Sequence, residues 1–487
     1  MSVRRSLFWS YGSQLITLAI TFTTSVIVAR LISPREMGIY ALALAISGVL
    51  SVFLAFGTQA FLVREKTIDT QTVRSAFTVN LALSSLLALC LLCAGLFSLL
   101  VRQHNEISAV FLIMAAGPLF SALEFVPAAL CMREMRYSTI SMISIVRALI
   151  TSFVTLTCLW WSAGAPGLAV GPVIANLVCA LVYMAARPRD LIFRPGLHRF
   201  REILVFGIQM LSISGVAQLA ARSSDIIIGN MLGLVALGLY SRASGLATLI
   251  FINVYGLATS VIFVQLSRDL RETGELHATF IRALRMITGA MWPILLGIAT
   301  LAGPLVLMLY GVKWLPAAVP LALLMIAQFI VLGFGMNWEL FVLRKETKRQ
   351  IWIEVSRAII GTAIFSIGCL FGLAAAAIGR IGEAIVGYIL YRPHIDRLAG
   401  TEPGEVDRVY RESLQLTAVA ITPSILLMGW WNWSPHVPLP LIAIAIVSGI
   451  VGWFLLLRYK RHPIANEILI LTARLFKRSA SATGHSS

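Results

Sequence analysis

The sequence predicts an all-α membrane protein with about fourteen transmembrane helices, arranged as two six-helix lobes and two further helices. Three observations support this fold class. Of the 487 residues, 58% are hydrophobic and only 13% are charged, about half the charged fraction of an average soluble protein. The apolar residues form runs of about 18–25, which is the length that crosses a bilayer as a helix. The two halves of the chain also repeat each other's motifs.

Fourteen apolar runs can be delimited along the chain. The opening residues MSVRR and the run after them resemble a signal peptide, but Tyr11, Gln14 and several threonines interrupt that run, so we expect a retained first helix. The predicted spans are 9–29, 38–62, 76–101, 108–131, 138–161, 164–186, 203–225, 236–264, 286–310, 316–343, 351–371, 373–390, 414–432 and 438–457.

Basic residues are distributed unevenly among the loops that these spans define. With the N-terminus inside, 30 of the 39 lysines and arginines fall in cytoplasmic segments, and the other nine fall in outer loops or inside spans. Cytoplasmic loops of membrane proteins carry such an excess, so the pattern predicts that both termini are cytoplasmic. The net charge of +17 is spread between the spans rather than gathered into a patch with stacking aromatics, so we expect no nucleic-acid partner.

The two halves share motifs at a nearly constant offset. ARLISPREMGIYALA at 29–43 matches GNMLGLVALGLYSRA at 229–243, and GLAVGPVIANLV at 167–178 matches AAAIGRIGEAIV at 375–386. Both halves start inside, so the repeat is parallel and implies a pseudo-twofold axis along the membrane normal. The predicted domains are an N-terminal lobe at 1–186, a basic cytoplasmic linker at 187–202, a C-terminal lobe at 203–390, a cytoplasmic loop with helices 13 and 14 at 391–457, and a basic cytoplasmic tail at 458–487.

No enzyme signature is present in the chain. It lacks the phosphate-binding GxxxxGK[ST] and the HExxH, GxSxG and GxGxxG motifs, and its predicted outer loops are short. We therefore expect no enzymatic activity and no cofactor. Two facing six-helix lobes are the usual architecture of alternating access, with the substrate between the lobes. Energy would then come from a gradient of the substrate or of an ion.

Three segments carry a family resemblance. They are SPREMGIYALALA at 33–45, RSSDIIIGNMLGLVALGLYSRA at 222–243 and LYGVKWLPAAVPLALL at 309–324. With them the whole chain resembles the polysaccharide-transport branch of the multidrug/oligosaccharidyl-lipid/polysaccharide exporter superfamily.

The resemblance implies two helix bundles around a cation-lined cavity. It also implies a flippase that moves oligosaccharides linked to undecaprenyl diphosphate to the outer leaflet of the bacterial inner membrane. The product would be O-antigen, capsule or exopolysaccharide. The expected partners are the lipid-linked oligosaccharide, membrane lipids, a polysaccharide polymerase and a chain-length regulator, and nothing in the sequence requires more than a monomer.

Arginines inside apolar runs are the strongest candidates for a binding site. A charge at a helix centre costs at least about 2.5–3.5 kcal/mol, so it indicates function or pairing. Arg147 has no carboxylate in its own span, and Arg357 occupies the matching place 210 residues later. The guanidinium fork suits phosphate oxygens, so we predict that Arg147 and Arg357 bind the substrate diphosphate. The alternative for Arg147 is an ion pair with Glu124 in the preceding span.

Further candidates are weaker. Arg242, Arg30 and Arg222 are predicted as additional cavity cations, although Arg242 could instead reach the outer headgroup region. Candidates for proton or sodium coupling, or for charge partners of the arginines, are Glu124, Asp225, Glu339, Glu354 and Glu383. Three pairs lie three residues apart and would neutralise each other on one helix face: Arg222 with Asp225, Glu354 with Arg357, and Arg380 with Glu383.

Polar residues also form stripes on two predicted helices. The residues are Tyr11, Gln14, Thr17 and Thr21 in the first span and Gln209 and Gln218 in the seventh. Such a stripe either lines a watery cavity that admits sugar hydroxyls or forms hydrogen bonds with neighbouring helices, and the sequence favours neither.

Three other functions fit parts of the sequence. A multidrug exporter of the same fold carries cationic drugs and would need an acidic cavity, against which Arg147 argues. A lipid II flippase would have the same architecture and would be essential to the cell. A membrane polysaccharide polymerase would need a long outer loop, whereas the longest predicted here has about a dozen residues.

Overall fold

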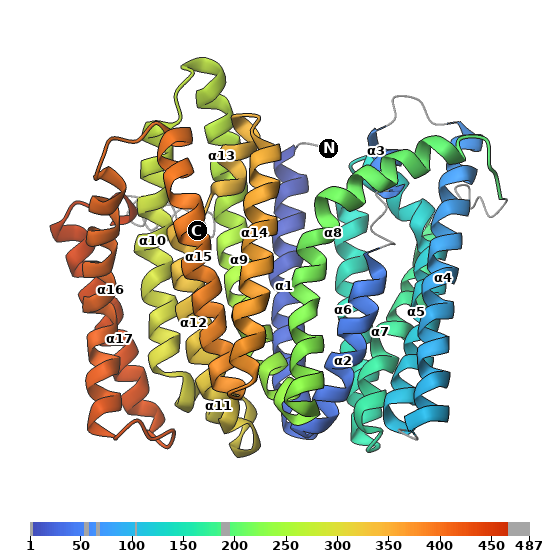
Figure 1. Cartoon of the computed structure of the whole chain (residues 1–487), viewed down its shortest axis with the longest axis horizontal. Coiled ribbons are helices and arrows are strands. Elements are labelled where there is room, and N and C mark those ends of the chain that lie inside the picture. Colours follow the sequence, from blue (N-terminus) through green and yellow to red (C-terminus); the bar gives the residue numbers. More distant parts are fainter. Residues whose placement is uncertain (1–2, 53–57, 65–68, 103–104, 187–194, 466–487) are drawn as a thin grey trace, which may run out of the picture. The chain divides into compact units, whose positions relative to one another are not determined.

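Every element of the computed structural model is helical in the residues that it describes, which are 3–52, 58–64, 69–102, 105–186 and 195–465 (Figure 1). Part of the predicted linker, 187–194, and most of the predicted tail, 466–487, lie outside these residues. The elements are α1 Val3–Leu31, α2 Pro34–Ser51, α3 Thr58–Arg64, α4 Thr70–Arg102, α5 Asn105–Arg133, α6 Tyr137–Trp160, α7 Gly164–Ala186, α8 Phe200–Met231, α9 Gly233–Glu272, α10 His277–Thr300, α11 Ala302–Tyr310, η2 Val312–Ala317, α12 Ala318–Gly333, α13 Asn337–Leu343, α14 Thr347–Cys369, α15 Leu373–Ala399, α16 Glu405–Trp430 and α17 Leu439–Tyr459.

The helices agree in place with the predicted spans. Each of the fourteen predicted spans coincides with one helix or with successive helices, which confirms an all-α membrane protein. Among the described residues, twelve helical segments are long and apolar enough to cross a membrane. The predicted spans 38–62 and 203–225 are not among the twelve, so the count of fourteen and the orientation of the termini stay predictions.

Tryptophans mark the ends of two membrane-spanning helices. The helix α6 ends at Trp160, which Trp161 follows, and α16 ends at Trp430. All three side chains are largely exposed in the chain by itself. Tryptophan prefers the interface between membrane and water, where its ring meets the headgroups and its N–H stays hydrated. These positions therefore fit the ends of transmembrane helices.

The first compact unit comprises Met1–Ser241, which is α1 to α8 and the first turns of α9. Within it, α5 packs against α4 and α7, and α6 packs against α7 and α1. The helix α8 packs against α2 and therefore belongs to this unit, although the sequence assigns 203–225 to the C-terminal lobe. The lobe boundaries at 1–186 and 203–390 stay predictions from the sequence.

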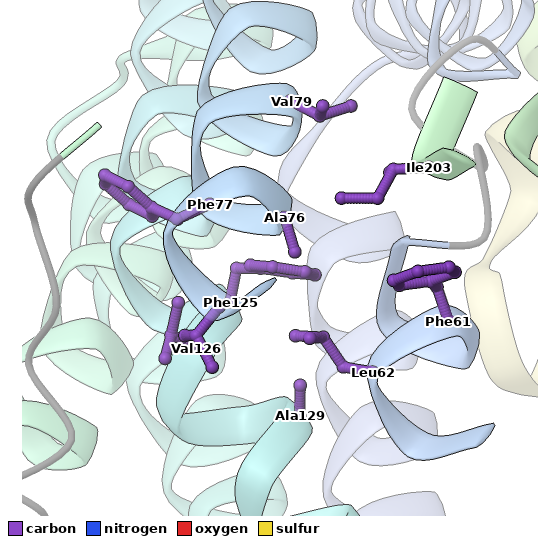
Figure 2. Packing of buried hydrophobic residues seen from close by; sticks show 10 residues of the cluster. Phe61, Leu62, Ala76, Phe77, Val79, Phe125, Val126, Ala129 and Ile203 are labelled. Atoms are coloured by element: carbon purple, nitrogen blue, oxygen red, sulfur yellow. The ribbon is translucent and has the colours of Figure 1, made fainter. Parts of the chain in front are cut away.

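A buried apolar cluster ties four helices of this unit together. Figure 2 shows its side chains converging from α3, α4, α5 and α8 on one shared space. The cluster consists of Phe61, Leu62, Val73, Ala76, Phe77, Val79, Phe125, Val126, Ala129 and Ile203. It fixes the short helix α3 against the long helices α4 and α5.

The motif SPREMG at the start of α2 is explained by helix capping. Ser33 Oγ accepts a hydrogen bond from the Glu36 backbone N–H at 3.3 Å, and Glu36 Oε2 accepts one from the Ser33 N–H at 2.6 Å. This reciprocal capping box satisfies two backbone donors that the first helical turn leaves open. Pro34 fits the first helical position because its missing N–H has no partner there in any case.

The same motif brings two glycines into contact. A Cβ atom built on Gly38 of α2 would lie 1.8 Å from the carbonyl oxygen of Leu234, and one built on Gly238 of α9 would lie 1.8 Å from that of Pro34. The four residues form two pairs, each with members exactly 200 apart in sequence, as in the predicted repeat. Backbones approach this closely only where no side chain intervenes. The first turns of α2 and α9 therefore cross backbone to backbone.

The second compact unit comprises Arg242–Ser487. Within it, α15 packs against α14 and α12, and α10 packs against α12 and α16. The helices α16 and α17 lie side by side (Figure 1). They correspond to the predicted spans 13 and 14 that follow the repeat.

The predicted span 316–343 is not one helix in the structure. It begins with η2, continues as α12 and breaks at 334–336 before α13, with Met336 in the left-handed region at φ 60°. The Tyr255 hydroxyl accepts a hydrogen bond from the Met336 N–H at 2.7 Å, and the Tyr410 hydroxyl donates one to the Gly333 carbonyl. These bonds satisfy backbone groups that the break would otherwise leave open inside the membrane.

Repeat-related residues make the same kind of contact inside each unit. A Cβ atom on Gly171 of α7 would lie 2.0 Å from Thr155 Oγ1 of α6. A Cβ atom on Gly379 of α15 would lie 2.9 Å from the Cα of Phe365 of α14. The glycines are 208 residues apart and their contact residues are 210 apart. Each half of the chain thus uses a glycine to bring its own pair of repeat-related helices together, α6 with α7 in the first unit and α14 with α15 in the second.

Candidate functional site

Arg147 lies at the centre of a polar cluster in the first unit. Its Nη2 contacts Glu124 Oε2 of α5 at 2.6 Å, and its Nη1 donates a hydrogen bond to Asn176 Oδ1 of α7. The Arg147 side chain is 34% exposed and that of Glu124 is 16% exposed. The ion pair that the sequence offered as an alternative is therefore confirmed as a contact.

The contacts in this cluster leave the Arg147 guanidinium with N–H bonds that can donate to a further acceptor. A guanidinium carries five N–H bonds, and these two contacts use two of them. The carboxylate and the amide hold the side chain in one orientation from two neighbouring helices. Three N–H bonds of the guanidinium remain for another acceptor, and the side chain is only partly buried, but Glu124 already neutralises its charge.

A larger network surrounds Arg357 in the second unit. Arg357 donates to Glu354 Oε2 through Nε at 3.0 Å and Nη2 at 2.8 Å, and to Glu383 Oε1 through Nη1 at 2.7 Å. Glu383 also accepts from Arg380 at 2.5 Å, and the Tyr391 hydroxyl donates to Glu354 Oε1 at 2.7 Å. The predicted pairs Glu354–Arg357 and Arg380–Glu383 are thus confirmed, and Glu383 joins them into a chain of two cations and two anions.

Two glycines make room for this network. A Cβ atom on Gly361 would lie 2.4 Å from Glu383 Cγ, and one on Gly387 would lie 3.0 Å from Arg357 Cδ and 2.7 Å from Phe334 Cζ. The Arg380 guanidinium lies over the Phe365 ring, 4.6 Å from its centroid. Arg357 is therefore more completely enclosed by partners than Arg147 is.

Arg242 lies in an aromatic pocket of the second unit. Only 6% of the residue is exposed, and its guanidinium lies 5.3 Å from the Tyr310 ring centroid and 5.2 Å from that of Trp314. Both aromatic residues belong to LYGVKW, so two of the quoted sequence motifs meet here. This geometry allows cation–π attraction and gives Arg242 a packing role.

Arg30 and Arg222 occupy different surroundings. Arg30 is exposed in the last turn of α1, and Arg222 is half-buried on α8. A Cβ atom on Gly48 of α2 would lie 2.8 Å from Arg222 Nε, so the glycine admits the arginine between the helices. The predicted pairing of Arg222 with Asp225 and the cavity roles of Arg30, Arg222 and Arg242 stay predictions.

Among the five predicted acidic residues, Glu339 stands apart. Glu124, Glu354 and Glu383 each contact an arginine. Glu339 is only 7% exposed, in the first turn of α13 after the helix break, and it forms no ion pair with any described lysine or arginine. A buried carboxylate within a predicted span is a candidate for a functional role, and for Glu339 this stays a prediction.

The polar stripe of α1 forms hydrogen bonds within its helix and with a neighbour. Thr21 Oγ1 donates to the Thr17 carbonyl at 2.8 Å, and Thr24 Oγ1 lies 2.7 Å from Ser152 Oγ of α6. Gln14 is exposed. The side chains of Tyr11, Gln209 and Gln218 are not among those that the structure describes. At Thr24 the stripe therefore bonds a neighbouring helix, and a cavity-lining role stays a prediction.

Sequence reasoning missed Asn176 and Tyr391. Asn176 is the lone amide in the apolar run GLAVGPVIANLV, and Tyr391 lies just past the predicted end of its span at 390. The signal for Asn176 was a polar residue inside a membrane helix, which usually has a partner on another helix. No comparable signal marks Tyr391, whose partner Glu354 lies on α14.

Comparison with known proteins gives this arrangement a context. The family model described as polysaccharide biosynthesis protein matches residues 27–319. The chain is 24% identical over 390 residues to the succinoglycan biosynthesis transport protein ExoT of Rhizobium meliloti, covering 76% of this chain and 75% of that protein. It is 23% identical over 328 residues to the lipopolysaccharide biosynthesis protein WzxC of Escherichia coli, covering 63% of each.

Solved structures show the same fold. The lipid II flippase MurJ in an inward closed conformation matches with a TM-score of 0.73 at 14% identity, over 93% of this chain and 99% of that one. An inward-facing multidrug resistance MATE family transporter of the MOP superfamily matches with a TM-score of 0.60 at 16% identity, over 80% and 96%. The chain belongs to the polysaccharide biosynthesis protein family and is a multi-pass membrane protein with the fold of these transporters.

Proposed function

We propose that this transporter moves a lipid-linked oligosaccharide, held by its diphosphate, from the inner to the outer leaflet of the bacterial inner membrane. Both termini would be cytoplasmic, the two six-helix lobes would alternate around the substrate, and a polymerase and chain-length regulator would use the product. The names of the related transport proteins support a polysaccharide precursor as the substrate. A transporter of this kind performs no chemical step itself.

The observation that carries the proposal is the geometry of Arg147. This permanent cation lies in a membrane-spanning helix, is oriented by groups of two other helices, and keeps a third of its side chain exposed. A guanidinium binds phosphate oxygens through parallel N–H bonds and does not lose its proton. Among the predicted cavity cations, Arg357 and Arg242 are more enclosed, so we assign the first contact with the diphosphate to Arg147 and a supporting role to the others.

A leaflet assay tests this function. In a strain that lacks the gene, a probe that labels only outer-face glycans should find the lipid-linked oligosaccharide confined to the inner leaflet. Complementation with Arg147→Gln should fail to restore outer-face labelling, and Arg147→Lys should restore part of it. Arg136→Gln, at the exposed start of the same helix, is the matched control and should restore labelling fully. Full labelling with Arg147→Gln would exclude the diphosphate role.

We also propose that Glu339 couples transport to protons or sodium ions. A carboxylate enclosed by packed helices favours its neutral form or a bound cation, and Glu339 has no described arginine to stabilise its charge. It follows the helix break at 334–336, where the Tyr255 hydroxyl accepts from the Met336 N–H. Transport by Glu339→Gln in vesicles should lose its dependence on the ion gradient. Retained dependence would exclude Glu339 from coupling.

A further inference from the structure

We propose that Glu124 acts as an internal counter-anion that competes with the substrate diphosphate for Arg147 and thereby sets the affinity of the site for anions. This inference rests on the proposed function. It adds a determinant of specificity, because a ligand would have to supply enough negative charge to bind beside Glu124 or to replace it. The binding site would then discriminate a diphosphate from anions of lower charge.

The geometry of the pair supports competition. Glu124 Oε2 lies 2.6 Å from Arg147 Nη2, which is the position that a phosphate oxygen would take in a charge-assisted hydrogen bond. The two side chains come from adjacent helices, α5 and α6, so their contact is not imposed by sequence neighbours. The Glu124 side chain is 16% exposed and that of Arg147 is 34% exposed, so the carboxylate is the more enclosed member of the pair.

The surroundings of Arg147 contain a single negative charge among its described contacts. The other contact, Asn176 Oδ1, is a neutral amide oxygen that accepts a hydrogen bond without neutralising the cation. Arg357 differs, because two carboxylates contact it and one of these is shared with Arg380. Displacing one carboxylate therefore exposes the full charge of Arg147 but not that of Arg357.

Electrostatics predicts opposite effects for two isosteric substitutions. Glu124→Gln removes the negative charge beside Arg147 and keeps the size of the side chain, so an anion no longer meets repulsion in a medium of low dielectric. Asn176→Asp adds a negative charge on the other side of the guanidinium. If Glu124 only braced Arg147, its replacement would weaken anion binding instead, because the arginine would lose its orientation.

The test is binding of inorganic pyrophosphate and of orthophosphate to the purified full-length protein in detergent, measured by isothermal titration calorimetry. Glu124→Gln should bind pyrophosphate at least about tenfold more tightly than the wild type, and it should prefer pyrophosphate over orthophosphate less strongly. Asn176→Asp should bind pyrophosphate more weakly. Glu106→Gln, in the exposed first turn of the same helix α5, is the matched control and should bind as the wild type does.

The outcomes separate this inference from the function on which it rests. Unchanged or weaker pyrophosphate binding by Glu124→Gln, or unchanged binding by Asn176→Asp, would overturn the competition. Wild-type binding by Arg147→Gln would overturn the proposed role of the arginine itself. If Glu124→Gln does not fold, Glu124→Ala gives the same comparison, because it also removes the negative charge and should tighten pyrophosphate binding, whereas loss of a brace would weaken it. The gain from Glu124→Gln should disappear in the double variant that also carries Arg147→Gln.

Discussion

The contact between α2 and α9 depends on Gly38, and Gly38→Ala is the sharpest test of the packing. The added methyl group would lie 1.8 Å from the carbonyl oxygen of Leu234, and real Cβ atoms do not come closer than about 3.0 Å to such an atom. One backbone therefore has to move by at least about 1.2 Å. The clash is with backbone rather than with a flexible side chain, so rotation of a side chain cannot relieve it.

The magnitude follows from two opposing effects. Overpacking a close contact costs about 1–3 kcal/mol, and a backbone clash belongs at the upper end of that range. Replacing glycine by alanine inside a helix returns about 1 kcal/mol. We expect a net loss of about 2 kcal/mol, which changes the ratio of folded to unfolded protein by about thirtyfold. A loss of this size should lower the apparent melting temperature in detergent.

The matched control is Gly245→Ala on α9, the helix that α2 contacts at Gly38. No atom lies within 4 Å of a Cβ built on Gly245, so only the gain in helix propensity applies and the melting temperature should stay or rise. The double variant Gly38→Ala with Gly238→Ala should lose less than the two single losses together, because one separation of the helices relieves both clashes. A Gly38→Ala protein that melts like the Gly245→Ala protein would refute the reasoning.

Three further predictions test other contacts. Arg242→Lys should lower the melting temperature by an amount that corresponds to about 1–2 kcal/mol, because an ammonium cannot stack on Tyr310 and Trp314 as a guanidinium does; an unchanged temperature would mean that the stacking contributes nothing. Gly361→Ala should displace Glu383 and reduce stability and transport, whereas Gly297→Ala, which meets no atom within 4 Å, should do neither. Bonds from Arg397 at 2.6 and 2.7 Å lower the pKa of Glu346 from 4.5 to about 2. Glu346→Gln should therefore have a lower melting temperature than the wild type at neutral pH, and this difference should close as the pH falls from 4.5 towards 2. A difference that persists at the lowest pH would contradict the assigned cause.

Hydropathy and spacing were sufficient to predict the helices but not their interruptions. The run 316–343 is apolar throughout and therefore predicts one span, yet the chain breaks at 334–336. Gly335 gives a weak signal, but Met336 takes a left-handed conformation that methionine rarely adopts. The hydroxyl of Tyr255, distant in sequence, accepts from the Met336 N–H, so a contact that stabilises the break lies outside the local sequence.

The candidate site was predictable where one helix contains both partners. Glu354 with Arg357 and Arg380 with Glu383 follow from a spacing of three residues, because side chains at that spacing share a helix face. The bond between Arg357 and Glu383 depends on how α14 and α15 are aligned, and hydropathy does not determine that alignment. For the same reason, the contact of Arg147 on α6 with Asn176 on α7 could not be predicted from hydropathy.

The two halves of the chain share their packing more closely than their charges. Gly171 and Gly379 bring equivalent helices together in each unit, so both units need a small residue at the same place. Around the arginines, however, the first unit has one carboxylate and one amide, and the second has two carboxylates and a second arginine. A repeat preserves whatever the backbone geometry requires, while charges can differ wherever a site binds only one ligand. The proposed substrate is asymmetric, with a diphosphate at one end and sugars at the other, and such a ligand calls for such a difference. Under that proposal, Arg147 rather than Arg357 is the residue to replace first.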